Sequence, residues 1–226
     1  MAVEHIAVIA IDGPSASGKG TVAQLVAQQL GFHYLNSGAI YRVAALAARR
    51  AGIALDDEAK LIHLAQGLDL RFAGEDILLN GESVTDALRS EQSGNDASKI
   101  AALPELRRAL LGRQRAFRVA PGLVAEGRDM GSVVFPDASP KIFLTASMDA
   151  RAQRRHKQLM GKGMCVNLSQ ILQELSERDA RDRSRSVAPL QMCADASLLD
   201  TTSLSVEQAV AEVLRRYAEA SRMASP

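Results

Sequence analysis

The segment IAVIAIDGPSASGKGTVAQLVAQQLG, residues 6–31, decides the fold that is expected for this chain of 226 residues. Its first six residues are all apolar and four of them are β-branched, which is typical of a strand buried on both faces of a parallel sheet. The run VAQLVAQQL has helical periodicity and is followed by Gly31, a common residue just beyond the end of a helix. A strand, a glycine-rich loop and a helix are therefore expected in immediate succession.

The loop of this segment, GPSASGK at residues 13–19, fits the phosphate-loop pattern GxxxxGK. Glycines let successive backbone N–H groups turn toward phosphate oxygens, and the dipole of the following helix favours the same anion. Lys19 is expected to reach the β- and γ-phosphates. The pattern is specific for a nucleoside triphosphate but not for a reaction. The candidate ATP-binding residues are Gly13, Pro14, Ser15, Ala16, Ser17, Gly18, Lys19, Gly20 and Thr21.

The rest of the chain alternates between apolar runs and helical patterns. Strands are expected at residues 33–35, 123–126, 141–145 and 198–200, and helices at 39–51, 104–119, 149–160, 168–181 and 205–220. This alternation predicts an α/β fold of the P-loop NTPase type, a parallel sheet covered by helices on both faces. Residues 68–85 differ, since their period-2 pattern, with turn signals at 73–76 and at Asn80-Gly81, predicts a small antiparallel insert.

The composition limits the classes of partner. The net charge of +1 argues against generic binding to nucleic acid or to anionic membranes, and the 4% content of aromatic residues argues against stacking platforms for single strands. No segment has the pattern of a signal peptide or the length of a membrane span, so a cytoplasmic protein is expected. Cys165 and Cys193 lack the spacing of a metal site and are expected to be free thiols.

Four further segments carry most of the functional information. They are LNSGAIYR at residues 35–42, RQRAF at 113–117, AEGRDMGSVVFP at 125–136 and RDARDRSR at 178–185. In this order, and together with the phosphate loop, they resemble the bacterial cytidylate kinases over essentially the whole chain. The resemblance implies ATP-dependent phosphorylation of CMP and dCMP, with Mg²⁺ accompanying ATP. It also implies a monomer whose partners are these small-molecule substrates.

The same resemblance implies a single P-loop kinase domain over residues 1–226. Its core would comprise residues 1–65 and 103–226, with a nucleotide-binding insert at about 66–102 and a helical lid at about 150–185. A lid suits the chemistry, because water competes with the acceptor for the transferring phosphoryl group.

The resemblance also assigns roles to individual side chains. Arg42 and Arg128 fall where the family binds the 5′-phosphate of the acceptor, with Ser15 and Ser37 as additional hydroxyl donors. Two guanidinium groups can neutralise a phosphate dianion and hold it in line for transfer. These residues are therefore expected to position the nucleophile.

Three other residues fall where the family reads the cytosine base: Ser98, Arg107 and Asp129. A carboxylate can accept a hydrogen bond from the exocyclic N4 amine of cytosine, whereas uracil presents an acceptor at the same place. Asp182 and Arg185 fall where the sugar and phosphate are held, and Arg178 and Arg181 resemble the arginines of the lid. The catalytic residues that the resemblance implies are Lys19, Arg128, Arg181 and Arg185.

Taken singly, each of these residues is also compatible with a purely structural role. Arg107 could be a solvated residue on a helix of mixed charge, and Asp129 could pair with Arg128 in a turn. Residues 178–185 could form an exposed helix with i,i+4 ion pairs. Their joint occurrence in family order favours the functional interpretation.

The chain departs from the pattern that the resemblance leads us to expect at two positions. Asn36 and Glu126 stand where aspartates are expected, and an amide brings no charge to a metal. In the general phosphate-loop pattern a serine or threonine follows the lysine; here Gly20 does, a variant that occurs in nucleoside monophosphate kinases, and it leaves Ser17 or Thr21 to approach Mg²⁺. The metal ligands therefore stay open, and the candidates are Ser17, Thr21, Asn36 and Glu126.

Two other functions remain as alternatives. An adenylate, shikimate or dephospho-CoA kinase would share the phosphate loop and differ in the acceptor. A nucleotide-dependent switch without catalysis would not need the arginines of the acceptor side. A GTPase switch should also contain an NKxD-type guanine motif, which the sequence lacks.

Overall fold

The computed structural model describes residues 6–73, 76–161, 163 and 165–224. The chain folds into two compact units. The first, called the sheet unit, comprises Met1–Leu35 and Ala116–Pro226, and the second, called the helical unit, comprises Asn36–Arg115.

A five-stranded sheet in the order β2-β6-β1-β7-β8 forms the centre of the sheet unit. Its strands are β1 (Ala7–Asp12), β2 (His33–Asn36), β6 (Gly122–Gly127), β7 (Lys141–Thr145) and β8 (Ser197–Asp200). Strand β1 pairs in parallel with both β6 and β7, and β7 pairs in parallel with β8. The side chains from Val8 to Ile11 are almost completely buried, as the apolar run predicted. The expected parallel sheet is confirmed.

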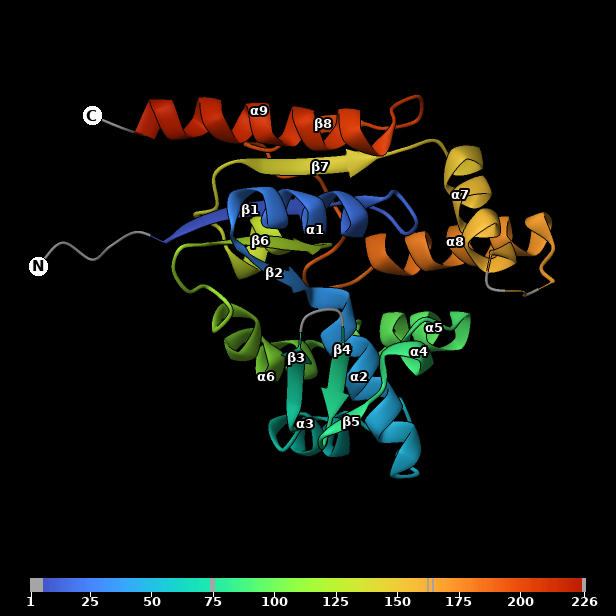
Figure 1. Ribbon diagram of the computed structural model, residues 1–226. Coiled ribbons are helices and arrows are strands. Elements are labelled where there is room, and N and C mark those ends of the chain that lie inside the picture. The colour runs from blue at the N-terminus through green and yellow to red at the C-terminus, as the bar shows by residue number, and fades with distance from the viewer. Residues whose placement is uncertain (1–5, 74–75, 162, 164, 225–226) are drawn as a thin grey trace, which may run out of the picture. The chain divides into compact units, whose positions relative to one another are not determined.

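Helices flank this sheet (Figure 1). Helix α1 (Lys19–Leu30) and helix α9 (Val206–Ala224) share one hydrophobic core with the central strands. Helix α7 (Met148–Met160) and helix α8 (Leu168–Arg183) pack on each other around a smaller core of their own. The α7–α8 pair and the end of β6 supply most of the charged groups beside the phosphate loop.

The helical unit combines helices with the predicted antiparallel insert. Its helices are α2 (Ser37–Arg50), α3 (Glu58–Gln66), α4 (Thr85–Leu88), α5 (Glu91–Ile100) and α6 (Pro104–Arg115), and its strands are β3 (Leu70–Ala73), β4 (Asp76–Leu79) and β5 (Glu82–Ser83). Strand β4 pairs in antiparallel fashion with β3 and β5. Asn80 and Gly81 both have positive φ, 51° and 81°, as a tight hairpin turn requires. The other predicted turn, at 73–76, includes residues 74–75, which lie outside the described residues.

Some predicted elements were wrong in extent or missing. The helix expected at 104–119 ends at Arg115, and the helices α3, α4 and α5 were not predicted. Residues 130–134 form a short π-helix, η1 (Met130–Val134), which the sequence pattern did not indicate. Helix α5 was missed because its sequence EQSGNDASKI is mostly polar and shows almost no apolar periodicity.

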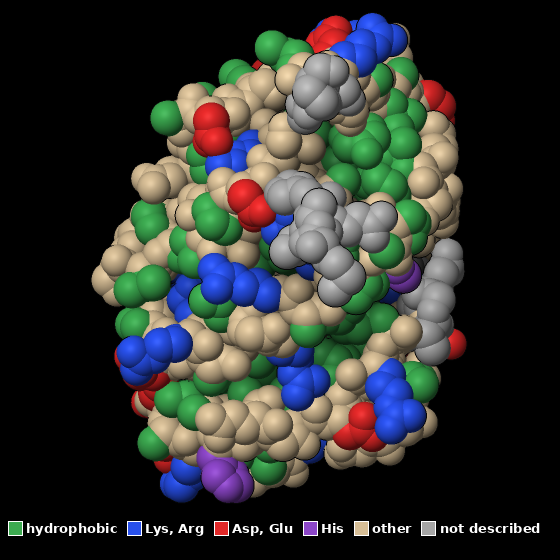
Figure 2. Space-filling model, turned by 90° about the vertical axis from the view of Figure 1, so that its left-hand side faces the viewer, with side chains coloured by type: hydrophobic (Ala, Val, Ile, Leu, Met, Phe, Trp, Pro, Cys, Tyr) green, Lys and Arg blue, Asp and Glu red, His purple; other side chains and the backbone are tan. Residues whose placement is uncertain are grey.

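The surface carries charges of both signs. On the face shown in Figure 2, basic and acidic side chains are interspersed with apolar and uncharged ones, in keeping with a net charge of +1. Within the described ranges, no helix combines the length and apolarity that crossing a bilayer requires.

Candidate active site

The phosphate loop connects β1 to α1 and depends on glycine at two positions. A Cβ atom at Gly13 would lie 2.0 Å from the carbonyl oxygen of Leu144, so a larger residue would displace the backbone of β7. Gly18 precedes α1 with a φ of 94°, a conformation that other residues adopt only with strain. The loop also buries Ser15 and Ser17. The local sequence therefore fixes the loop that the motif predicted.

Lys19 is buried at the start of α1 and folds back over the loop. Its ammonium group donates to the carbonyl of Pro14 at 3.1 Å, and its Nζ lies 3.8 Å from Oε2 of Glu126. Burial and the positive charge of Arg128 lower the pKa of Lys19 from 10.5 to about 7, although Glu126 acts in the opposite direction. Such a desolvated cation interacts strongly with any anion that reaches the loop.

Glu126 occupies the carboxyl end of β6 beside the loop. It is buried, and its Oε1 accepts a hydrogen bond from the hydroxyl of Tyr34 at 3.4 Å. A Cβ atom at Gly20 would lie 3.4 Å from Oε1 of Glu126 and 3.6 Å from the hydroxyl oxygen of Tyr34. Both distances are ordinary van der Waals contacts, so a side chain at position 20 would begin directly against Glu126 and Tyr34.

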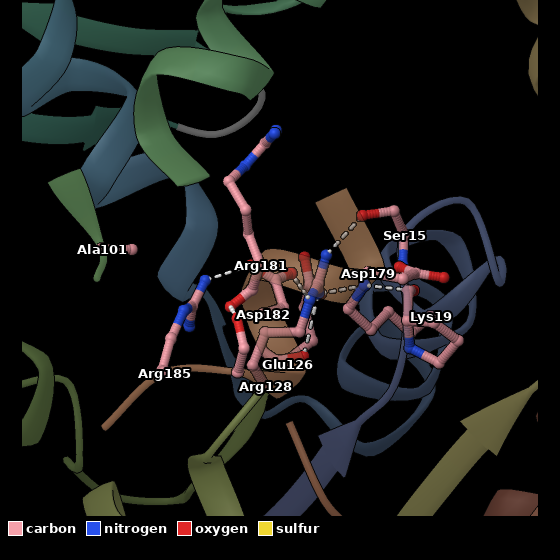
Figure 3. A network of polar contacts seen from close by, with 12 residues as sticks. Ser15, Lys19, Ala101, Glu126, Arg128, Asp179, Arg181, Asp182 and Arg185 are labelled. Atoms are coloured by element: carbon pink, nitrogen blue, oxygen red, sulfur yellow. Dashed lines mark hydrogen bonds and ion pairs between the residues drawn. The ribbon is translucent and has the colours of Figure 1, made fainter. Parts of the chain in front are cut away.

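Arg128 uses its guanidinium group to join three parts of the sheet unit (Figure 3). It donates from Nε to Oδ2 of Asp182 at 2.7 Å, from Nη2 to the hydroxyl of Ser15 at 2.9 Å and from Nη1 to the carbonyl of Gly127 at 3.1 Å. Arg185 donates to the other oxygen of Asp182. The structure thus brings together Ser15, Arg128, Asp182 and Arg185, all of which the sequence singled out.

The electrostatics of this group favour its ionised form. Burial alone would raise the pKa of Asp182, but the charges of Arg128 and Arg185 outweigh it and lower the pKa to about 2. Burial likewise acts to lower the pKa of Arg128, and Asp182 more than compensates, so that this pKa is raised. This cluster of the sheet unit therefore carries fixed charges at any physiological pH.

Helix α8 is not the exposed helix considered as an alternative. Asp179 and Asp182 are 1% and 2% exposed, and only the opposite face of the helix is solvated. The guanidinium of Arg181 points away from Lys19 and Arg128 in Figure 3. The helix itself ends at Arg183, so Arg185 lies just beyond it.

Sequence reasoning missed two arginines of α7. Arg151 donates to the carbonyl of Ser15 at 2.9 Å, and Arg154 donates to the carbonyl of Ser17 at 3.1 Å. The two arginines stand one helical turn apart, so they reach carbonyls of alternate loop residues from the same face of α7. Their spacing was the only signal in the sequence, and it is too common to be specific.

Asp12 was also missed. It ends β1, it is buried, and its carboxylate accepts from the backbone N–H groups of Met130 and Gly131, both at 2.8 Å. These groups directly follow Arg128 and Asp129, so Asp12 holds the turn that presents both side chains. Burial raises the pKa of Asp12 from 3.8 to about 6, against the effect of the two hydrogen bonds. An acidic residue at the end of an otherwise apolar strand was the available signal.

The raised pKa of Asp12 predicts a pH-dependent contribution to stability. The folded protein binds the extra proton between pH 3.8 and about 6, so stability falls as the pH rises through 6. In Asp12→Asn this position has no titrating group. When the pH is lowered from 7 to 5, the free energy of unfolding of the unaltered protein should rise by roughly 1 kcal/mol more than that of Asp12→Asn. Urea unfolding of both proteins measures this difference. A difference that is constant with pH would show that Asp12 stays ionised over the range.

The helical unit holds the other predicted acceptor residues. Arg107 is 7% exposed, donates to the carbonyl of Ala101 at 3.0 Å and lies 5.6 Å from the centre of the Tyr41 ring. The alternative that Arg107 is a solvated surface residue is therefore wrong. Ser37 and Ser98 are also buried.

Arg42 lies at the middle of α2 in the same unit. Its Nη1 donates to the carbonyl of Leu88 at 2.7 Å and to that of Ser90 at 3.3 Å. The guanidinium thus joins α2 to the last residue of α4 and to the residue that caps α5.

The four candidate metal ligands differ in their surroundings. Ser17 is 1% exposed, and its hydroxyl has no hydrogen-bond partner within the described residues. Thr21 is exposed. The side-chain oxygen of Asn36 accepts from the N–H of Ala39 at 3.0 Å and so caps α2. Among the residues that the structure describes, no three His, Cys, Asp or Glu side chains form a metal-binding cluster.

A parallel sheet, a phosphate loop with a buried lysine, and arginines gathered around that loop define a P-loop kinase. The chain belongs to the cytidylate kinase family, because its residues 9–219 match the model of that family, which is described as Cytidylate kinase.

Two curated relatives, both named cytidylate kinase, match almost the whole chain. The relative from Nitrosomonas europaea is 55% identical over 217 residues, which cover 96% of this chain and 97% of the relative. The relative from Chromobacterium violaceum is 58% identical over 214 residues, which cover 95% of this chain and 96% of the relative.

The solved structure of a gluconokinase from Sinorhizobium meliloti is similar in fold alone. It is 17% identical, has a TM-score of 0.50, and the match covers 96% of this chain and 95% of that one.

Proposed function

We propose that this protein transfers the γ-phosphoryl group of ATP to CMP and dCMP. The observation that carries the proposal is the identity of 55% to 58% with curated cytidylate kinases over 95% to 96% of the chain. The phosphate loop supports the donor side, since its motif and buried lysine suit a nucleoside triphosphate. The activity belongs to pyrimidine nucleotide metabolism.

The nucleophile in this reaction is an oxygen of the acceptor 5′-phosphate. A phosphomonoester has a second pKa of about 6 and is mostly dianionic at neutral pH, so no catalytic base is needed. The task of the enzyme is to bring two polyanions together and to stabilise the charge of the transferring group. We propose that Lys19, Arg128, Arg181 and Arg185 supply the positive charge.

The proposed site residues form two groups, one for each substrate. The loop from Gly13 to Thr21 is proposed to bind ATP through its backbone N–H groups. The residues proposed to bind CMP are Ser37, Arg42, Ser98, Arg107, Arg128, Asp129, Asp182 and Arg185. Asp129 is 4% exposed, and a desolvated carboxylate discriminates sharply between a donor and an acceptor on the base.

Mg²⁺ is proposed to accompany ATP. This ion prefers oxygen ligands and keeps several from water and phosphate, so few protein groups are needed. The residues present fit such a site, because the buried hydroxyl of Ser17 lacks a partner within the described residues and Glu126 supplies a buried carboxylate. We propose that these two residues, rather than the exposed Thr21 or the capping residue Asn36, lie nearest the ion. When bound, the ion would neutralise phosphate charge.

Other features of the proposal rest on the family. We propose a single kinase domain with a nucleotide-binding insert at about residues 66–102 and a lid at about residues 150–185. We also propose that the protein acts as a cytoplasmic monomer.

An assay of ADP release with ATP and Mg²⁺ tests this function, with CMP, dCMP, UMP, AMP, GMP and shikimate offered in parallel. Strong turnover of CMP and dCMP, weak turnover of UMP and none of the others is expected. Turnover of another acceptor would agree with the assignment as a kinase but contradict the assignment of the cytosine-binding residues. No turnover with any acceptor would favour a nucleotide-dependent switch.

Asp129 should determine the preference for cytosine. Replacing Asp129 by Ala removes the acceptor for the N4 amine of cytosine, so the ratio of kcat/KM for CMP to that for UMP should fall about 10–100-fold. The matched control is Asp137→Ala, which removes an exposed carboxylate paired with Arg118 and should leave the ratio unchanged. An unaltered ratio in Asp129→Ala would show that another residue reads the base.

A further inference from the structure

Ser15 is held by charged side chains from three other elements of the sheet unit. Its N–H donates to Oδ1 of Asp179 at 3.1 Å, its carbonyl accepts from Arg151 at 2.9 Å, and its hydroxyl accepts from Arg128 at 2.9 Å. Figure 3 shows Asp179 and Arg128 meeting at Ser15. The N–H, the carbonyl and the hydroxyl of this one loop residue are thus all bound by buried or half-buried ionised groups.

Arg151 and Asp179 also bind each other. Nη1 of Arg151 donates to Oδ2 of Asp179 at 2.6 Å, and the two side chains are 5% and 1% exposed. Nε of Arg151 donates to the carbonyl of Ala146 at 3.1 Å, which anchors the guanidinium to the start of α7. A buried pair with these additional hydrogen bonds is rigid, because moving either partner would leave a buried charge unpaired.

This contact fixes the direction of the loop backbone. The N–H of Ser15 donates its hydrogen bond to Asp179, and the carbonyl of Ser15 accepts one from Arg151. The peptide groups on both sides of Ser15 therefore cannot rotate, and the loop N–H groups that follow them keep one orientation. The same restraint holds the Ser15 hydroxyl at the position where Arg128 donates to it.

We propose that the Arg151–Asp179 pair is a positioning pair for phosphoryl transfer. The pair touches neither substrate in this proposal. It acts through Ser15, by fixing the first turn of the phosphate loop and the guanidinium of Arg128. The inference rests on the proposed function only in naming the acceptor, since the orientation of the loop would govern any nucleotide bound there.

Two variants and one matched control test the pair. Asp179→Asn keeps an acceptor for Ser15 but removes the charge opposite Arg151. Arg151→Lys keeps the charge but loses the fork that reaches both Ser15 and Asp179. Val213→Ala is the control, since Val213 is a fully buried core residue of α9 with no part in the network, and its truncation destabilises the protein without touching the loop.

Both ADP binding by calorimetry and kcat with CMP are measured on folded protein, well below the midpoint of unfolding. The Kd for ADP should rise and kcat should fall, each about tenfold or more in both variants, because a small misplacement of reacting groups is enough for such losses. The CMP-to-UMP ratio should not change. Val213→Ala should retain both constants within about twofold, although it unfolds at a lower temperature.

A double variant tests the action through Arg128. If the pair positions Arg128, the fold-loss of kcat in the double variant of Asp179→Asn and Arg128→Lys should be smaller than the product of the two single fold-losses. Multiplicative losses would overturn this part of the proposal.

Unchanged kcat and Kd in folded Asp179→Asn would overturn the proposal as a whole. Should that variant fail to fold, unchanged constants in Arg151→Lys would do the same. ADP binding needs no acceptor, so an unaltered protein that binds ADP but does not phosphorylate CMP would contradict the proposed function and leave the test of the pair intact.

Discussion

Replacing Lys19 by Met should lower kcat for CMP about 10²–10³-fold or more, since one preorganised charge at a developing anion is commonly worth that much. Lys19 is the buried cation of the phosphate loop, and its ammonium group lies beside Pro14 and Glu126. Methionine fills a similar volume without the charge. Loss of turnover with little change in the structure is therefore the expected result.

The stability of Lys19→Met separates this loss from unfolding. Burial and Arg128 lower the pKa of Lys19 to about 7, which means that the folded protein disfavours the charged form. An apolar side chain of similar size removes this cost, but it also leaves the buried carboxylate of Glu126 without its ion-pair partner, so the two effects oppose each other and the melting temperature should change little. A large loss of activity with little change in stability is therefore expected.

The control for this variant is Lys60→Met, which removes an exposed lysine that pairs with Asp57. It should retain the kcat of the unaltered protein. Unchanged kcat in Lys19→Met would contradict the assignment of the phosphate loop. A lowered melting temperature with lost activity would instead show that Lys19 supports the fold.

The elements that the sequence predicted are those whose signals are local. The expected strand at 141–145 coincides with β7, and the apolar run at 6–11 corresponds to β1 within one residue at each end. In β1, burial on both faces requires a continuous apolar run, and in β7 the apolar residues from Ile142 to Leu144 give a shorter run; both runs are visible without knowing their neighbours. The phosphate loop is equally local, because its glycines are needed by the loop itself.

Helix α5 could not be predicted in this way, since its stability comes from a distant contact. Asp96 of α5 is 1% exposed and accepts hydrogen bonds from Arg49 of α2 and from Gln92. The partner Arg49 is 47 residues away in the chain. Nothing within EQSGNDASKI indicates that a charged residue faces inward.

The same reason explains the missed residues of the site. Asp12 binds backbone groups 118 and 119 residues away, and Arg151 reaches the carbonyl of Ser15 over 136 residues. Such partners are determined by the order of strands in the sheet and not by any nearby pattern. Arg128 and Asp182 were found only because the family resemblance marked them.

Arg128→Lys is the second variant for which a large loss is expected. Three nitrogens of Arg128 donate to three different groups, on Asp182, Ser15 and Gly127. A lysine ammonium is a single point on a flexible chain, so it cannot keep the fork geometry that also suits a phosphate. We expect kcat/KM for CMP to fall about 10²–10³-fold, with a smaller change in the KM for ATP.

The stability of Arg128→Met shows what the charge of Arg128 contributes to the fold. Asp182 would stay buried with Arg185 still beside it, so its pKa should rise from about 2 toward the ordinary value of 3.8. Because a lowered carboxyl pKa stabilises the folded state above the unfolded value, this loss should appear at neutral pH and shrink as the pH falls through 3.8 toward 2. The free energy of unfolding at pH 7 should drop by roughly 2–4 kcal/mol.

Arg215→Lys is the matched control for both variants, since Arg215 is an exposed arginine of α9 in the same unit and pairs with Glu212 and Glu219. It should alter neither kcat/KM nor the free energy of unfolding by a measurable amount. If Arg128→Lys kept the kcat/KM of the unaltered protein while Arg128→Met lost only stability, Arg128 would hold Asp182 and Ser15 in place without touching the acceptor phosphate. Loss of kcat/KM in Arg128→Lys with stability retained would instead assign the guanidinium fork to the substrate, because the charge that the fold requires would still be present.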